Sequence, residues 1–308
     1  LAEGLTADLE RDLGTAAAAA PGRAVLRRLL IGLYVGLVRP LVDAARHGDA
    51  ETATTARAAL VRHRARALKP LLDALSEPDP TLQRAGLDLL GALGNPNATA
   101  ALLALAERTA APDGGAASSE FRRRAMRAAA MLADPRATPR FIGLLRSDDG
   151  VVAALAAWTL GRIDTPAARA ALVATLRDAN ARWELRAAAA LGLGRDRAPG
   201  TVVLLRQIAL CDPQRTAPQG CPGPLAPGLQ GAALAALGPH LDAAAMPAVR
   251  AALARNDVWI RLGALTALGR ATRARDAAAQ EAVRWTFHGD GGWSQGTPRV
   301  REAAMGAL

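Results

Sequence analysis

The sequence predicts an all-α protein that folds as a solenoid of stacked helix–turn–helix repeats, and two patterns predict it. The first is a pair, usually an apolar residue followed by a small one, that recurs along the chain. The pairs are Leu90-Gly91, Ala129-Ala130, Leu160-Gly161, Leu191-Gly192, Leu237-Gly238 and Leu268-Gly269. Their second residues are 39, 31, 31, 46 and 31 residues apart, and Gly306 follows after 37, so a repeat of about 31 residues carries three insertions. The second pattern is the absence of alternating apolar residues, which argues against strands.

Three columns of residues, counted back from the second residue of each pair, predict the first helix of each repeat. Twelve residues before it stand side chains typical of helix N-caps, namely Asp79, Ser118, Asp149, Asn180, Asp257 and Ser294. Nine before it is an apolar column: Leu82, Phe121, Val152, Trp183, Leu229 and Ile260. Five before it the residues are small: Gly86, Ala125, Ala156, Ala187, Ala233 and Ala264. These offsets share one helical face, so the pair leucines, Leu191 among them, and the core tryptophan Trp183 are expected to be buried.

A short proline-containing loop and a further apolar column predict the second helix. The loops are Asn95-Pro96, Asp134-Pro135, Thr165-Pro166 and Ala198-Pro199. Eleven residues past the pair stand Leu102, Phe141, Leu172, Val203 and Val249. Extrapolation backward from Gly91 gives Leu60 and Leu71, so a first, degenerate repeat is expected at roughly 50–77.

At this point the chain resembles a known family. The stretches "LQRAGLDLLGALGNPNATAALLALAE" and "WIRLGALTALG" are similar to HEAT-like repeats of the phycobilisome-lyase type, and the resemblance covers about 50–308. It implies a right-handed all-α superhelix, with first helices on the convex side and second helices on the concave side. It implies little about chemistry, because the family includes scaffolds, lyase subunits and inhibitors.

The expected organisation is an N-terminal helical cap at 1–48 and a repeat array at 49–308. The array holds seven full repeats and the first helix of an eighth. The cap lacks the period, and "TAAAAAPGR" separates two expected helices within it. Because the last helix would leave an apolar face uncovered, we expect further chain or a partner beyond it.

Composition limits the classes of function. No apolar run is long enough to span a bilayer. The net charge is +10, but its arginines are spread along the chain, and only Arg122 to Arg124 with Arg127 form a cluster. Nucleic acid is therefore a disfavoured partner, and a protein partner is favoured.

Both cysteines, Cys211 and Cys221, flank the turn-rich insertion "CDPQRTAPQGCPGP". No further cysteine or histidine accompanies them at a metal-binding spacing. A disulfide is therefore predicted, which favours a periplasmic or secreted location over the cytoplasm, since disulfides persist in oxidising compartments. Two reduced, buried thiols are the alternative.

Candidate contact residues lie near the insertions at 111–119, 211–225 and 289–296. These insertions fall between repeats and are expected along one edge of the solenoid, either as a binding edge or as tolerated loop growth. The candidates are Arg122, Arg123, Arg124, Trp285 and Trp293.

No catalytic, cofactor or metal site is predicted. The four histidines are scattered, and neither a phosphate loop nor a nucleophile elbow is present. The leading hypothesis is a non-catalytic scaffold within a larger assembly. The alternatives are a bilin lyase-like subunit, an alkylpurine DNA glycosylase-like enzyme, for which Asp164 after Trp158 is the nearest motif, and a charge-driven nucleic-acid binder.

Overall fold

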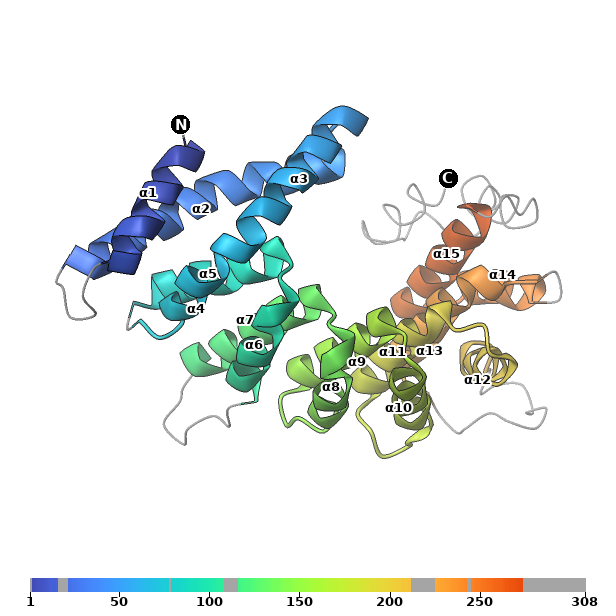
Figure 1. Ribbon diagram of the computed structural model, residues 1–308. Coiled ribbons are helices and arrows are strands. Elements are labelled where there is room, and N and C mark those ends of the chain that lie inside the picture. The colour runs from blue at the N-terminus through green and yellow to red at the C-terminus, as the bar shows by residue number, and fades with distance from the viewer. Residues whose placement is uncertain are drawn as a thin grey trace. The chain divides into compact units, whose positions relative to one another are not determined.

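A computed structural model describes residues 2–15, 22–77, 79–107, 116–211, 225–242 and 245–273, and all regular elements in these ranges are helices (Figure 1). The chain forms two compact units, Leu1–Arg140 and Phe141–Leu308. Successive helical hairpins stack within each unit, so the predicted all-α solenoid is confirmed.

The first unit opens with two helices before the repeats. Its helices are α1 (Ala2–Thr15), α2 (Gly22–His47), α3 (Ala50–Arg66), α4 (Leu68–Ala74), α5 (Pro80–Leu93), η1 (Pro96–Ala98), α6 (Thr99–Ala106), α7 (Ala116–Leu132) and η2 (Pro135–Ala137). The helix α8 (Thr138–Leu144) spans the boundary between the units. The long helix α2 packs against α3, α4 and α5, where the sequence places the cap. Its Tyr34 is fully buried and donates a hydrogen bond to Glu10 of α1, which ties the two N-terminal helices together.

The second unit continues the same hairpin pattern. Its helices are α9 (Gly150–Ile163), α10 (Pro166–Arg177), α11 (Trp183–Gly192), η3 (Leu193–Arg195), α12 (Pro199–Ala209), α13 (Pro227–Leu237), η4 (Gly238–His240), α14 (Met246–Leu253) and α15 (Val258–Arg273). The first helices of its repeats, α9, α11, α13 and α15, pack in sequence against one another. Leu160, Leu237 and Leu268 are buried along these seams, as predicted.

The turn inside a repeat follows from three consecutive residues. The first adopts a left-handed backbone and ends the first helix; this residue is Gly94, Ala133 or Asp164, with φ of 68°, 47° and 55°. The second, Asn95, Asp134 or Thr165, caps the next helical segment by accepting a backbone N–H bond. Proline then occupies the first helical position, where its missing N–H costs nothing.

Glycines let the first helices of the second unit touch backbone to backbone. A Cβ atom on Gly161 of α9 would lie 2.3 Å from the Cα of Gly192 of α11, and one on Gly263 of α15 would lie 2.1 Å from the carbonyl oxygen of Gly231 of α13. These seams therefore have no room for a side chain, which explains how a chain with few aromatic residues packs tightly.

The structure corrects the register of the repeat built on α11. The second residue of a pair contacts the next repeat at a fixed position, two residues before that repeat's own second pair residue. Gly238, for example, lies against Ala267, which is two residues before Gly269. Gly161 faces Gly192 in this way, so the equivalent of Gly161 is Gly194, and the pair of this repeat is Leu193-Gly194. Leu193 is buried, whereas Leu191 is 42% exposed.

This two-residue shift accounts for the errors of the sequence prediction in this repeat. Trp183 is 41% exposed instead of buried, because it begins α11 and lies against Gly228 at the start of α13. Val203 is exposed, and Leu205 takes its place in the core. The residue before α11 is Arg182 rather than Asn180, so two extra residues lie in the loop before this helix.

Candidate interaction surface

The arginine cluster in the middle of α7 makes contacts between repeats. Arg122 donates from Nε to the carbonyl oxygen of Ala106 at the end of α6, at 3.3 Å. Arg124 pairs with Asp88 of α5, with an Nη1–Oδ2 distance of 2.9 Å. Arg123 also has a partner. The prediction that these residues contact another molecule is not tested by this geometry, but two of them already serve internal contacts.

The bond from Arg122 belongs to a recurring device. A side chain in the first half of a first helix donates to a carbonyl at the end of the preceding second helix or in the segment that follows it. The four donor–acceptor pairs are Gln83 to Glu77, Arg122 to Ala106, Arg186 to Leu176 and Gln230 to Cys211. Helix ends leave carbonyl groups without a hydrogen-bond donor in the same helix. Each of these side chains provides such a donor and thereby links consecutive hairpins.

The other residues predicted from the sequence are only partly described. Trp285, Trp293 and Cys221 lie outside the described residues. Cys211 is buried and lies two residues past the end of α12, at the start of the insertion. The predicted disulfide between Cys211 and Cys221 therefore stays a prediction.

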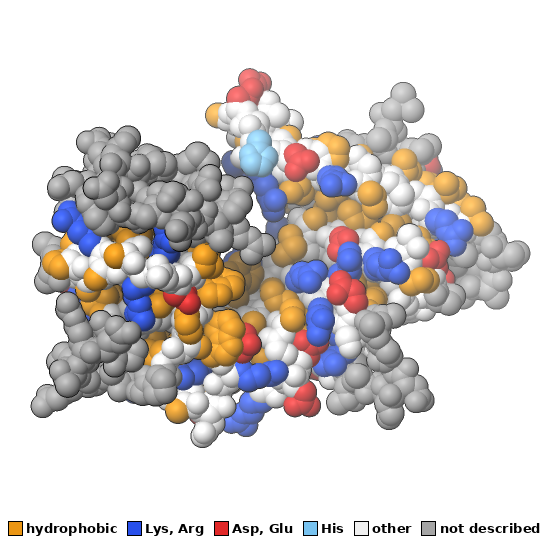
Figure 2. All heavy atoms as spheres, turned by 180° about the vertical axis from the view of Figure 1, so that it is seen from behind, with side chains coloured by type: hydrophobic (Ala, Val, Ile, Leu, Met, Phe, Trp, Pro, Cys, Tyr) orange, Lys and Arg blue, Asp and Glu red, His pale blue; other side chains and the backbone are white. Residues whose placement is uncertain are grey.

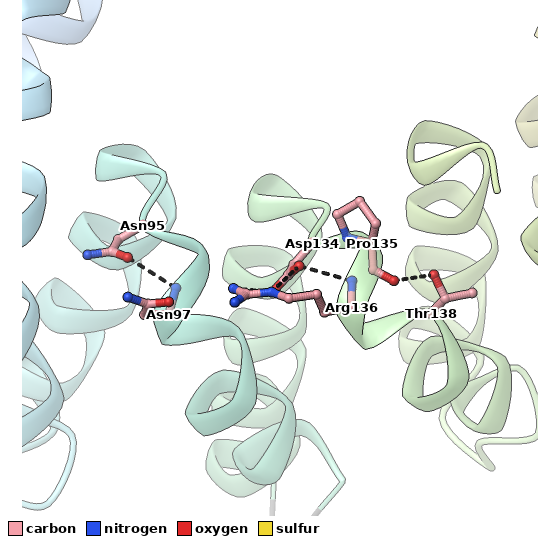
Figure 3. A network of polar contacts seen from close by, with 6 residues as sticks. All are labelled: Asn95, Asn97, Asp134, Pro135, Arg136 and Thr138. Carbon is pink, nitrogen blue, oxygen red and sulfur yellow. Dashed lines mark hydrogen bonds and ion pairs between the residues drawn. The ribbon is translucent and has the colours of Figure 1, made fainter.

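A hollow of about 310 Å³ lies in the first unit between two consecutive turns. It is lined by Pro96, Asn97, Thr99, Ala100, Asp134, Arg136, Ala137 and Arg140. The two turns are similar in sequence, Asn95-Pro96-Asn97-Ala98-Thr99 and Asp134-Pro135-Arg136-Ala137-Thr138. Figure 3 shows their side chains bonding back to the turns, with the Asn95 amide oxygen accepting from Asn97 N–H and the Thr138 hydroxyl donating to the Pro135 carbonyl.

The charges of this hollow are already paired. Arg136 donates from Nη2 to Asp134 Oδ2 at 3.0 Å, and this guanidinium holds the pKa of the Asp134 carboxyl below its usual value. Arg140 forms a two-pronged contact with Glu107 and donates to the Ala100 carbonyl. The hollow therefore offers hydrogen-bonding groups but little unpaired charge to a ligand.

Large apolar side chains remain exposed on the second unit. They are Val151, Trp158, Trp183, Leu191, Val203 and Trp259. Trp158 is 43% exposed and Trp259 is 52% exposed. Exposed aromatic side chains are typical anchors of protein interfaces.

Charged side chains are mixed in sign on the face that Figure 2 shows, where blue arginines lie among red carboxylates and orange apolar groups. Several of the ion pairs join different parts of the fold. Arg206 of α12 pairs with Asp242, in the segment before α14, at 2.7 Å, and Arg66 of α3 pairs with Glu10 of α1 at 2.8 Å. Much of the basic charge thus serves contacts within the protein. Within the described ranges, no group of three His, Cys, Asp or Glu residues could hold a metal ion, and no helix is long and apolar enough to cross a membrane.

Comparisons with known proteins support the repeat assignment. Residues 114–194 match the family of HEAT repeats. No curated protein matches the chain.

Several solved structures match the chain at low identity and with TM-scores below 0.5. Human deoxyhypusine hydroxylase in complex with glycerol is 17% identical with a TM-score of 0.36, covering 94% of this chain and 98% of its own. The complex of CpcE and CpcF of phycocyanin lyase from a Nostoc species is 21% identical with a TM-score of 0.40, covering 81% and 93%. YibA of Escherichia coli is 14% identical with a TM-score of 0.41, covering 95% and 98%.

Proposed function

We propose that this chain, an all-α solenoid of HEAT-like repeats, is a non-catalytic scaffold that binds another protein within a larger assembly. The observation that carries the proposal is the set of large apolar side chains left exposed on the second unit, three tryptophans among them. Each of these tryptophans is 41–52% exposed. Burying half-exposed tryptophans against a partner is a common source of binding energy at interfaces.

The architecture supports the same proposal. Helix ends are capped by neighbouring hairpins, and the glycine seams fix the distance between first helices. A stack held in this way presents its surface side chains in a fixed arrangement, which lowers the entropic cost of ordering them on binding.

The chain purified under mild conditions from its native cells should co-purify with a protein partner in a fixed stoichiometry, measured by light scattering and mass spectrometry. Replacing Trp183 and Trp259 with alanine should weaken this association, because both indoles are exposed. Replacing exposed Glu184 with glutamine is the matched control. A chain that elutes alone, or a complex indifferent to the tryptophan replacements, contradicts the proposal.

We further propose that Cys211 and Cys221 form a disulfide and that the protein works outside the reducing cytoplasm. Cys211 is buried, and its carbonyl accepts a bond from the Gln230 amide, so the start of the insertion is anchored to α13. Non-reducing mass spectrometry of protein from its native compartment should find the two cysteines linked. Changing both to serine should leave helicity nearly unchanged, because neighbouring repeats stabilise the stack. Two free thiols would remove both the disulfide and the argument for location.

A further inference from the structure

Trp158 of α9 and Leu191 of α11 occupy equivalent positions in adjacent repeats. Each lies three residues before the second residue of its pair, Gly161 and Gly194 respectively. Trp158 is 43% exposed and Leu191 is 42% exposed. Leu191 is equivalent to Trp158 only in the corrected register, because the predicted register placed Leu191 in the core.

The backbone contact between the two helices places these side chains along one seam. A Cβ on Gly192 would lie 3.1 Å from the carbonyl oxygen of Ala157 and 3.3 Å from the Cα of Gly161. Trp158 follows Ala157, and Leu191 precedes Gly192, so each exposed residue is one position away from a residue where the helices touch. We call Trp158 and Leu191 the seam pair.

Basic side chains follow the seam pair along the chain, and we call this side of the surface its basic end. The Arg162 guanidinium lies 4.8 Å from the centre of the Trp158 ring, a cation–π contact on α9. Arg195, at the position equivalent to Arg162 in the next repeat, is exposed, and so is Arg197.

The acidic residues near this end have partners of their own. Asp164 pairs with Arg169 at 2.9 Å, and Asp196 accepts a hydrogen bond from the Thr201 hydroxyl at 2.6 Å. The neutral Thr201 hydroxyl leaves Asp196 charged, but Arg195 and Arg197 outnumber this one carboxylate, so the basic end keeps a positive excess. A negatively charged group beside an apolar one would complement it.

We propose that the seam pair binds an acidic amphipathic helix of a partner protein. Apolar side chains of the partner would cover Trp158 and Leu191, and its carboxylates would meet Arg195 and Arg197. An amphipathic helix suits this surface because its apolar face can cover exposed side chains from two adjacent helices while its polar face carries the carboxylates. The inference rests on the proposed scaffold function and names the partner's chemistry.

Site-specific photo-cross-linking in native cells tests the assignment. The full chain would carry a benzophenone amino acid in place of Leu191, and a second variant would carry it in place of Val203, an exposed apolar residue on α12. The expected result is a cross-link from position 191 to a partner peptide with apolar residues at helical spacing and flanking Asp or Glu. A basic peptide, a second copy of this chain or a lipid at position 191 would overturn the inference. A cross-link from 203 and none from 191 would overturn it and leave the scaffold function standing, whereas no cross-link from either would count against both.

Binding of the cross-linked partner segment, as a labelled synthetic peptide, gives the quantitative test. We expect Trp158→Ala to weaken binding at least tenfold, and the pair Arg195→Glu with Arg197→Glu to weaken it at least as much at low salt. Added salt should weaken binding of the unchanged protein more than that of the charge-reversed variant. Val61→Ala, at an exposed valine of α3 in the first unit, is the control and should bind normally. Since both arginines are exposed, the reversed variant should keep its helical circular dichroism; unchanged affinity in that variant contradicts the inference.

Discussion

At the residue scale, the end of each first helix depends on one left-handed residue. Gly94 adopts this conformation without a steric penalty, and Asp164 tolerates it. Ala133 occupies the same position between them, with a φ of 47°. Its Cβ makes this conformation unfavourable by about 1 kcal/mol. The α7 turn is therefore the least favourable of the three.

Ala133→Gly should stabilise the protein by about 0.5–1 kcal/mol, because glycine removes the Cβ penalty at a positive φ. The gain should appear as a higher midpoint in thermal unfolding followed by circular dichroism. Ala128→Gly, inside the same helix, is the control and should destabilise by a similar amount. A loss of stability in both variants would contradict the account of this turn.

At the scale of the element, α11 shows how far the sequence defines the fold and where it fails. Periodicity, capping residues and proline loops were enough to predict hairpins, and Asp79, Asp149 and Asp257 do cap helices. Periodicity alone chose Leu191-Gly192 because it lies 31 residues after Gly161. The better signal was the turn, because proline stands five residues past the pair at Pro96, Pro135 and Pro166. It does so at Pro199 only if the pair is Leu193-Gly194.

The candidate surface was harder to predict for a related reason. Whether Trp183 or Leu191 is buried depends on a two-residue difference in loop length, which hydrophobicity does not report. The arginine cluster was recognisable as a cluster. Its use in capping Ala106 and pairing with Asp88 depends on the neighbouring hairpin, which only the stacked structure reveals.

Paired alanine substitutions test the corrected register. Leu193→Ala should cost about 2–5 kcal/mol, because it removes a fully buried side chain. Leu191→Ala should cost far less, because that side chain is largely exposed. Denaturant midpoints measured side by side would show the difference, and a larger effect at 191 than at 193 would restore the original register.

The glycine seam between α9 and α11 gives a second prediction at this scale. Alanine in a helix is favoured over glycine by about 1 kcal/mol, but at position 161 its Cβ would meet the Gly192 backbone. Overpacking of this kind costs about 1–3 kcal/mol or more, so Gly161→Ala should destabilise the protein. Gly143→Ala, whose Cβ would have no neighbour within 4 Å, should be neutral or stabilising. Urea titration of both variants would measure the two changes in the free energy of unfolding.

At the scale of the whole molecule, each hairpin is stabilised chiefly by the hairpins beside it. A local defect in such an array weakens nearby repeats first and distant ones little. The helices that the structure describes share no single central core through which damage at one point would reach all others.

Hydrogen exchange of Leu193→Ala should show this graded response. Exchange should rise most in α9, α11 and α13, less in α15, and least in α2 and α3, where the N-terminal helices have their own contacts. Mass spectrometry of peptides from the variant and the unchanged protein would measure it. A uniform rise across all peptides would mean that the chain unfolds as one cooperative body.

The exposed tryptophans also determine what the intrinsic fluorescence of the protein can report. The three described indoles, Trp158, Trp183 and Trp259, are about half exposed to water in the folded chain, so their emission should already be shifted toward that of free indole before any denaturant is added. Their fluorescence is then a poor reporter of unfolding. It is a sensitive reporter of a molecule that binds to α9 or α11. On such binding, the emission of Trp158 should shift to shorter wavelength and its quenching by iodide should decrease.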